Sequence, residues 1–130
     1  MADYQIRRDE SQAAKEIKAS AHYAYVQNGI TLDGSTFDDG ELVEAGLCVA
    51  KNDDTDKYEA YSESTEGEFE DGYSDPMILD TSVKFETDDD GNNADQVVGE
   101  VLVHGAVYES MLTGVTDAFK EKLAGAIRFV

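Results

Sequence analysis

The apolar residues of this chain fall into short runs separated by acidic turns. These runs contain many β-branched or aromatic side chains, which favour strands, and they lie at residues 42–51, 57–61, 77–85 and 97–108. Asn28-Gly29 is a strong turn signal. The single proline, Pro76, is expected at a strand entry because it has no N–H to donate to a sheet. The pattern predicts a mainly β fold, a small β-sandwich or β-barrel-like domain.

One helix is predicted near the C-terminus. Thr116 is a suitable N-cap, and Asp117 favours the positive end of the helix dipole. Gly125 is the expected C-cap. The side chains expected on the buried side are Ala118, Phe119, Leu123 and Ala124. Residues 127–130 then predict a terminal strand, which must pair inside the domain or with a neighbouring subunit.

The first 28 residues are predicted to form an extended N-terminal arm, and residues 29–130 a single β-rich domain. Alternating residues in the second half of the arm would share one face of a strand: Ile17, Ala19, Ala21, Tyr23 and Tyr25. A chain of 130 residues has little room for a second core. Deleting residues 1–28 is therefore expected to leave a folded body.

Charge divides the chain in the same place. The whole chain has 29 Asp and Glu against 10 Lys and Arg, a net charge of −19. Residues 1–28 have four acids and four bases and are neutral, whereas residues 29–114 have 23 acids and three bases, a net charge of −20. Such a surface opposes binding to nucleic acid and to anionic membranes. The sequence contains no secretory signal and no apolar stretch long enough to span a bilayer.

The sequence shows no constellation typical of an enzyme, so no catalytic residue and no cofactor is predicted. Cys48 lies in an apolar run and is expected to be a small buried side chain. His22 and His104 lie in different regions, and His104 is expected at a strand end or a subunit contact. Phosphate-binding loops and zinc-binding motifs are absent from the sequence.

An alternative function is a free-standing acidic β module that binds calcium or a cationic ligand. Residues 86–91 place oxygen ligands and a glycine as an EF-hand loop would, but position 12 of that loop is Val97 instead of glutamate. A weak calcium site would use Asp88, Asp90 and Asn92. The competing interpretation is a solvated hairpin turn whose carboxylates keep the protein soluble, and no metal site is assigned.

Five segments, in a fixed order, resemble the lambda-type head decoration proteins of tailed bacteriophages. The first runs from Asp39 through Ala45-Gly46 to Lys51, where a turn leads into a strand. The others are Lys57-Tyr58-Glu59-Ala60-Tyr61, Met77-Ile78-Leu79-Asp80, Val101-Leu102-Val103-His104-Gly105-Ala106-Val107-Tyr108, and the helix and strand from Ala118 to Val130. Ala126 stands where the last motif has a glycine. The resemblance covers roughly residues 30–130.

This resemblance implies a structural protein on the outer surface of the virion, made in the host cytoplasm. Its partners would be further copies of itself, as a homotrimer, and the major capsid protein of the expanded head, whose neighbouring subunits it would clamp. The trimer interface is expected near the apolar strand and the chain end, at Val103, His104, Val107 and Phe129. The arm would add to a capsid strand, through Tyr4, Ile6, Arg7, Arg8, Tyr23 and Tyr25.

Overall fold

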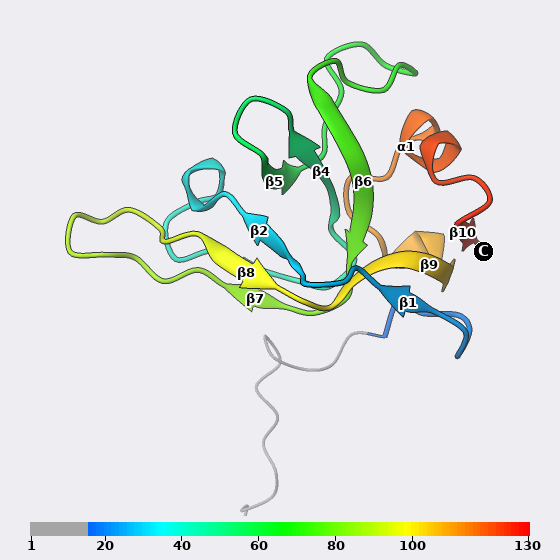
Figure 1. Ribbon diagram of the computed structural model, residues 1–130, viewed down its shortest axis with the longest axis horizontal. Coiled ribbons are helices and arrows are strands. Elements are labelled where there is room, and N and C mark those ends of the chain that lie inside the picture. Colours follow the sequence, from blue (N-terminus) through cyan, green and yellow to red (C-terminus); the bar gives the residue numbers. More distant parts are fainter. Residues whose placement is uncertain (1–15) are drawn as a thin grey trace, which may run out of the picture.

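In a computed structural model that describes residues 16–130, the chain is mainly β, as the sequence predicts (Figure 1). The described part has one α-helix, α1 (Asp117–Lys122), and two 3₁₀ turns, η2 (Gly34–Thr36) and η3 (Glu109–Met111). Its strands are β1 (Ala24–Tyr25), β2 (Ile30–Leu32), β3 (Leu42–Val43), β4 (Cys48–Asn52), β5 (Lys57–Ala60), β6 (Tyr73–Leu79), β7 (Val83–Lys84), β8 (Gln96–Val98), β9 (Val101–Val107) and β10 (Ile127–Phe129).

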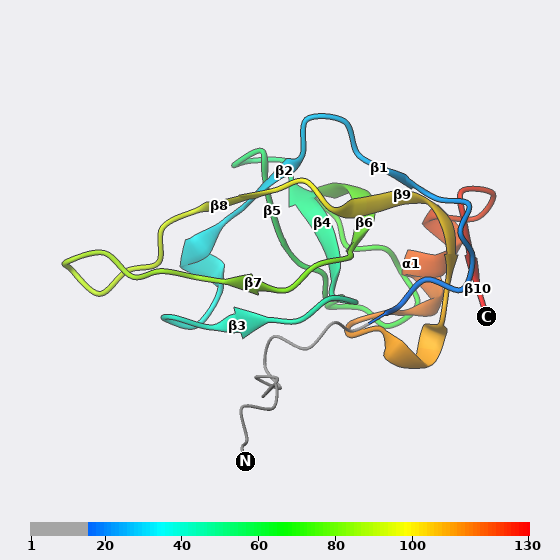
Figure 2. The ribbon, with the colours of Figure 1, turned by 90° about the horizontal axis from the view of Figure 1, so that it is seen from below.

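Eight strands form one sheet in the order β1-β9-β6-β4-β5-β2-β8, with β10 parallel to β9 (Figure 2). β3 and β7 form a separate antiparallel pair. Only two residues, Gly99 and Glu100, join β8 to β9, although these strands belong to opposite ends of the order. The sheet must therefore curl until β8 approaches β9. The pairing of β1 with β9 continues one residue further, where the N–H of Val26 donates to the carbonyl of Val101 (2.9 Å).

The central strands are buried on both faces of the sheet. Neighbouring residues of β4, β6 and β9 belong to two different hydrophobic clusters: Cys48, Ile78 and Leu102 pack with α1, whereas Val49, Leu79 and Val101 pack with the β3–β7 side. Strands buried on both faces are continuously apolar instead of alternating. This explains the unbroken apolar runs in the sequence. Burial also raises the pKa of the Cys48 thiol to about 12, so the prediction of a buried cysteine is confirmed.

The predicted turn at Asn28-Gly29 is confirmed. Both residues have positive φ, 70° and 73°, as in a type I′ turn. The turn joins β1 to β2, which pair with different strands. A side chain at Gly29 would also meet the carbonyl oxygen of Val98 at 2.7 Å. Glycine is therefore required here by both backbone conformation and space.

Pro76 lies inside a strand and not at its entry, so this prediction is wrong. It is the fourth residue of β6, where the register against β4 shifts between Val49 and Lys51. Asp75, just before it, has φ 49°. A β-bulge leaves its extra residue unpaired, so a residue without an N–H is tolerated there.

The C-terminal predictions are confirmed in their main features. The Thr116 hydroxyl accepts from the N–H of Phe119 at the start of α1, and Ala118, Phe119 and Leu123 are buried. The helix ends earlier than predicted, with Leu123 as its C-cap, while Gly125 lies in the following turn and Ala124 is exposed. The terminal strand is β10, and it pairs inside the domain with β9.

The structure corrects the extent of the predicted arm. Ile17 is completely buried in the α1 cluster, Lys18 forms a β-bridge with Val107, and β1 pairs with β9. Residues 16–28 are therefore part of the body's packing, and deleting residues 1–28 would remove core contacts. The predicted regular strand over residues 17–25 is also wrong, because Ala21 and Tyr23 are exposed while Ile17 is buried. Four arm residues of the sequence hypothesis, Tyr4, Ile6, Arg7 and Arg8, lie outside the described residues.

Substituting Ile17 with alanine should lower the free energy of unfolding by about 2–4 kcal/mol, because a fully buried side chain leaves a cavity when it is truncated. Urea denaturation followed by circular dichroism measures this. Val97→Ala is the control, since Val97 is 74% exposed and its truncation should leave the midpoint almost unchanged. Equal effects of the two substitutions would show that residue 17 does not belong to the core.

Candidate interaction face at β9 and β10

A buried carboxylate fastens the first described residues to the body. Asp80 follows β6 and is 8% exposed. Its Oδ2 accepts from Lys18 Nζ at 2.6 Å and from the hydroxyl of Tyr25, also at 2.6 Å. Its own N–H donates to the carbonyl of Glu100 (2.9 Å). The side chain therefore joins β6, the β8–β9 link and the segment that precedes β1.

The ionisation of the groups around Asp80 follows from this pairing. Burial alone would lower the pKa of Lys18, but hydrogen bonds to Asp80 and Glu16 outweigh it and raise this pKa above its ordinary value. Burial, together with the hydrogen bond to Asp80, raises the pKa of Tyr25 as well. At neutral pH the cluster is thus an ammonium and a neutral phenol that share one carboxylate oxygen. A paired, hydrogen-bonded carboxylate is the form in which a buried charge is tolerated.

The same segment crosses β9 at a glycine. Gly105 has φ +146°, and a Cβ there would lie 3.1 Å from Cβ of Tyr23. The Tyr23 ring lies 4.8 Å from Lys18 Nζ and 5.2 Å from the ring of Tyr25. Because Gly105 has no side chain, the segment before β1 can lie close to β9, with Tyr23 directly over Gly105.

Beside this crossing the surface has an open hollow that contains three of the five positively chargeable side chains that lie outside the ion pairs within residues 16–130. It contains both histidines and Arg128, and its lining residues are Ala19, Ser20, His22, His104, Gly105, Ala106, Tyr108, Arg128 and Val130. None of these lining residues is Asp or Glu. In a chain with 29 acids against 10 bases, this is a marked local reversal of charge. We call this surface the β9–β10 face.

The β9–β10 face is also where large apolar side chains reach solvent. Four large apolar residues of the described part are exposed: Tyr23, Val97, Tyr108 and Val130. Tyr108 and Val130, at 45% and 54%, line the hollow, and Tyr23 lies over Gly105 at its border. Among the described residues, β10 pairs only with β9, so its other edge has no strand beside it. Exposed aromatic residues and an open strand edge are features of interfaces.

The structure separates the predicted trimer residues. His104 is exposed and lines the hollow, whereas Phe129 on β10 is half-buried, lies opposite Val107 and packs against the α1 cluster. Val103 is half-buried against the other core cluster. Val107 is fully buried inside the domain, so its predicted role in a subunit contact is corrected.

Other members of the face were missed from the sequence. His22, Tyr108, Arg128 and Val130 lie in three separate segments that only the fold brings together. Of the predicted arm residues that the structure describes, Tyr23 borders the face and Tyr25 points to Asp80. The apolar character of residues 101–108 and 127–130 was the available signal, and it indicated β9 and β10 but not the segments beside them.

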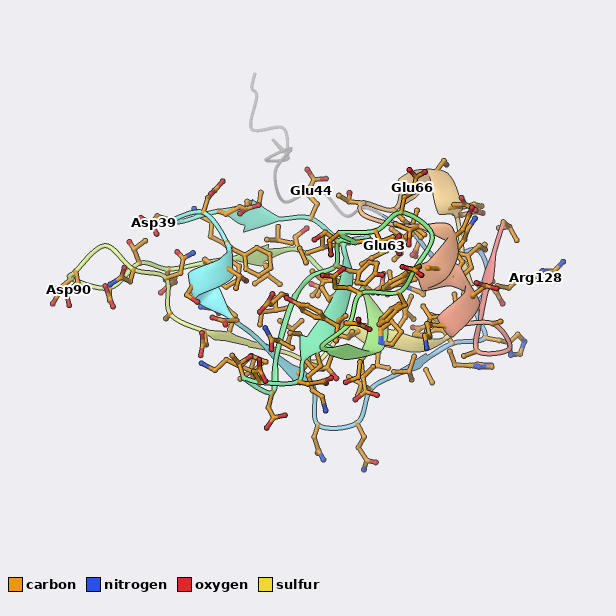
Figure 3. All side chains as sticks on the ribbon, turned by 90° about the horizontal axis from the view of Figure 1, so that it is seen from above. Asp39, Glu44, Glu63, Glu66, Asp90 and Arg128 are labelled. Carbon is orange, nitrogen blue, oxygen red and sulfur yellow. The ribbon has the colours of Figure 1, made fainter. Side chains whose placement is uncertain are left out.

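The acidic side chains gather elsewhere. Figure 3 shows Asp90 at the tip of the long β7–β8 hairpin, at the opposite end of the molecule from Arg128, and Asp39, Glu44, Glu63 and Glu66 along one side. At the hairpin tip Asp88 Oδ1 accepts from the N–H groups of Asp90 and Asn92, both at 2.9 Å. Within residues 16–130, no three His, Cys, Asp or Glu side chains are grouped as metal ligands. The Asp88 carboxylate therefore accepts hydrogen bonds from the backbone of its own turn.

Replacing Asp80 with asparagine should reduce the free energy of unfolding by about 2–4 kcal/mol, because Lys18 would keep its charge in a largely buried place with only the exposed carboxylate of Glu16 (3.1 Å) as its partner. The ordinary pKa of lysine is 10.5 and the folded value is higher, so the contribution is fully present at pH 7 and is lost only in strongly alkaline solution. Denaturation in urea at pH 7 measures it.

The matched control for this substitution is Asp75→Asn. It removes the carboxylate of an exposed pair with Lys51 (3.3 Å), which solvent screens, so its denaturation midpoint should not change measurably. A midpoint for the Asp80 variant equal to that of the control would contradict the role given to Asp80.

No helix of the described part is long and apolar enough to cross a membrane. Comparison of the chain with protein-family models, with curated proteins and with solved structures gave no match. Residues and geometry are therefore the basis for a function.

Proposed function

We propose that this protein is a capsid decoration protein of a tailed bacteriophage, which binds the outer surface of the expanded head as a trimer and stabilises contacts between major capsid subunits. The observation that carries the proposal is the β9–β10 face. An acidic β domain presents one surface that is apolar, free of carboxylate side chains and bordered by Arg128 and two histidines. The order of five sequence segments that resemble the lambda-type family supports the same function.

The charge distribution suits a closed ring of identical subunits. In a cyclic trimer each subunit offers two different surfaces, one to each neighbour. The β9–β10 face supplies one surface with exposed Tyr108, Val130 and Arg128, and the carboxylate-rich remainder of the next copy supplies the other. Complementary charge of this kind favours encounter in the correct orientation and disfavours contact between two acidic sides.

The remaining acidic surface has a role in the same proposal. Residues 29–114 have a net charge of −20, with 23 acids and three bases. Carboxylates that face outward would repel other decorated heads and keep them apart in solution. The neutral N-terminal residues, which include Arg7 and Arg8, would then contact the capsid. Three such segments on one trimer make the attachment multivalent, so weak single contacts hold together.

The calcium alternative has less support. Asp88 already accepts two backbone N–H groups, and the described residues present no grouped set of ligands. We therefore do not propose it as a second function.

Removing residues 2–15 should abolish binding to expanded heads while leaving the domain folded, because both core clusters lie within the remaining residues. Purified expanded heads are incubated with the full-length or the shortened protein and then sedimented. The bound copies are counted by gel densitometry. Circular dichroism of the shortened protein checks its fold. Saturation of heads by the shortened protein would contradict the proposed role of residues 2–15 in capsid binding.

Reversing the charge of Arg128 with Arg128→Glu should raise the concentration needed to half-saturate the heads at least about tenfold, since the β9–β10 face would then repel the acidic side of the next copy. Lys122→Glu makes the same change of charge on an exposed residue of α1 outside the hollow, and should bind like the parent. If both variants bind equally well, the β9–β10 face is not the subunit contact.

A further inference from the structure

A second hollow lies on the other side of the molecule, along β3. Its floor is apolar and its rim is acidic, with the lining residues Thr36, Phe37, Asp38, Glu41, Leu42, Val43, Glu44, Leu47, Ala60 and Thr113. No Lys, Arg or His is among these lining residues. Its volume is about 490 Å³, within the range of roughly 300–1,000 Å³ typical of binding sites. We call it the β3 groove.

The strand beside the groove has an open edge. Within residues 16–130, β3 pairs only with β7, where Leu42 lies opposite Lys84 and Val43 opposite Val83. Lys84 Nζ donates to the carbonyl of Gly40 (2.7 Å), so this cation is held at the turn before β3. An open strand edge next to an apolar hollow accepts an extended segment, whose main chain pairs with the edge and whose alternate side chains enter the hollow.

The described chain begins next to this groove. The Ile17 side chain lies 3.5 Å from the position that a Cβ of Gly46 would take, and the residue after Gly46 is Leu47, which lines the groove. Thr113, another lining residue, donates its N–H to the carbonyl of Gly46 (2.9 Å). Fifteen residues precede Glu16. The eleven residues from Ile6 to Ile17 span up to about 35 Å when extended, so they reach every part of the groove.

The sequence of that preceding segment matches the groove in chemistry. Residues 4–8 are Tyr-Gln-Ile-Arg-Arg, with two large apolar side chains in alternation followed by two of the three arginines of the chain. Tyr4 and Ile6 suit an apolar floor, and Arg7 and Arg8 suit a rim of carboxylates. Figure 3 shows Asp39 and Glu44 on this same side of the molecule.

We propose that residues 4–8 bind in the β3 groove of their own chain. Their own chain is the favoured source because a short tether gives an effective concentration in the millimolar range, which exceeds that of any segment from another copy in dilute solution. Resting on the proposed function, the segment that contacts the capsid is stored on the domain until a capsid strand competes for it. Binding to the head then exchanges one set of contacts for another.

The test uses disulfide formation in the full-length chain. The variant Ile6→Cys/Leu42→Cys places one thiol in the segment and one in the groove, and Ile6→Cys/Ala60→Cys is a second pair at an exposed lining position in case the first folds poorly. The control is Ile6→Cys/Val97→Cys, since Val97 is 74% exposed on β8, away from β3 (Figure 2). Cys48 is fully buried with a raised pKa and does not compete for the oxidant.

In a buffer of oxidised glutathione, the groove pairs should close intramolecular disulfides at least about tenfold faster than the control pair, measured by mobility on non-reducing gels and by mass spectrometry. Adding Arg7→Glu and Arg8→Glu to the groove pair, or raising the salt concentration, should reduce this advantage. Equal rates for groove and control pairs would overturn the inference. Predominant disulfide-linked dimers would overturn it too, because the occupant would then be another copy.

The same variants separate this inference from the proposed function. Expanded heads should bind less of the oxidised groove variant than of the same variant after reduction, so that the Ile6→Cys substitution is present on both sides of the comparison. If the parent protein does not bind heads at all, the proposed function fails, and a rapid groove disulfide still supports storage of the segment. If the parent binds heads and the groove pairs close no faster than the control, storage fails and the proposed function stands.

Discussion

The carboxylate of Asp80 is the interaction on which the described surfaces depend. It holds Lys18 and Tyr25 through one oxygen at 2.6 Å each, and thereby lays the residues before β1 across β9. This placement buries Ile17, covers the edge of β9 at Val107 and brings Tyr23 to the border of the β9–β10 face. It also fixes where the chain enters the domain, next to Gly46. The ion pair acts together with backbone hydrogen bonds of the same segment to β9, from the N–H of Ala19 to the carbonyl of Ala106 (2.8 Å) and from the N–H of Tyr108 to the carbonyl of Ile17 (2.9 Å).

The two surfaces lie on different sides of the domain and differ in the charge of the side chains around their apolar residues. The β9–β10 face has apolar side chains with Arg128 and histidines, whereas the β3 groove has apolar side chains with a rim of carboxylates. Both border a strand whose outer edge is open among the described residues. The curled sheet is buried on both faces along β4, β6 and the first residues of β9, so the two hollows lie outside this region, one over the end of β9 with β10 and one beside the separate β3–β7 pair.

Features that depend on neighbouring residues in the sequence were predictable. The Thr116 cap, the Asn28-Gly29 turn, the burial of Cys48 and the β class all follow from local patterns. The errors arose where contacts between residues distant in the sequence determine the local conformation or burial. Pro76 is tolerated in a strand by a bulge against β4, Ile17 is buried by α1 and β9 instead of lying in an arm, and Val107 faces inward. The pairing of Lys18 with Asp80, 62 residues apart, left no signal in either segment.

The side-chain amide of Asn93 makes four hydrogen bonds between the long β7–β8 hairpin and the neighbouring segment of residues 34–40. Asn93 accepts from the N–H of Gly40 and donates to the carbonyls of Gly34, Phe37 and Asp38, so it ties the hairpin to the turn that follows η2. Beyond it the tip around Gly91 is exposed, with no atom within 4 Å of a Cβ built there. The tip is therefore a position where a foreign peptide could be inserted for display, carried at the far end of the molecule from Arg128 and anchored by Asn93.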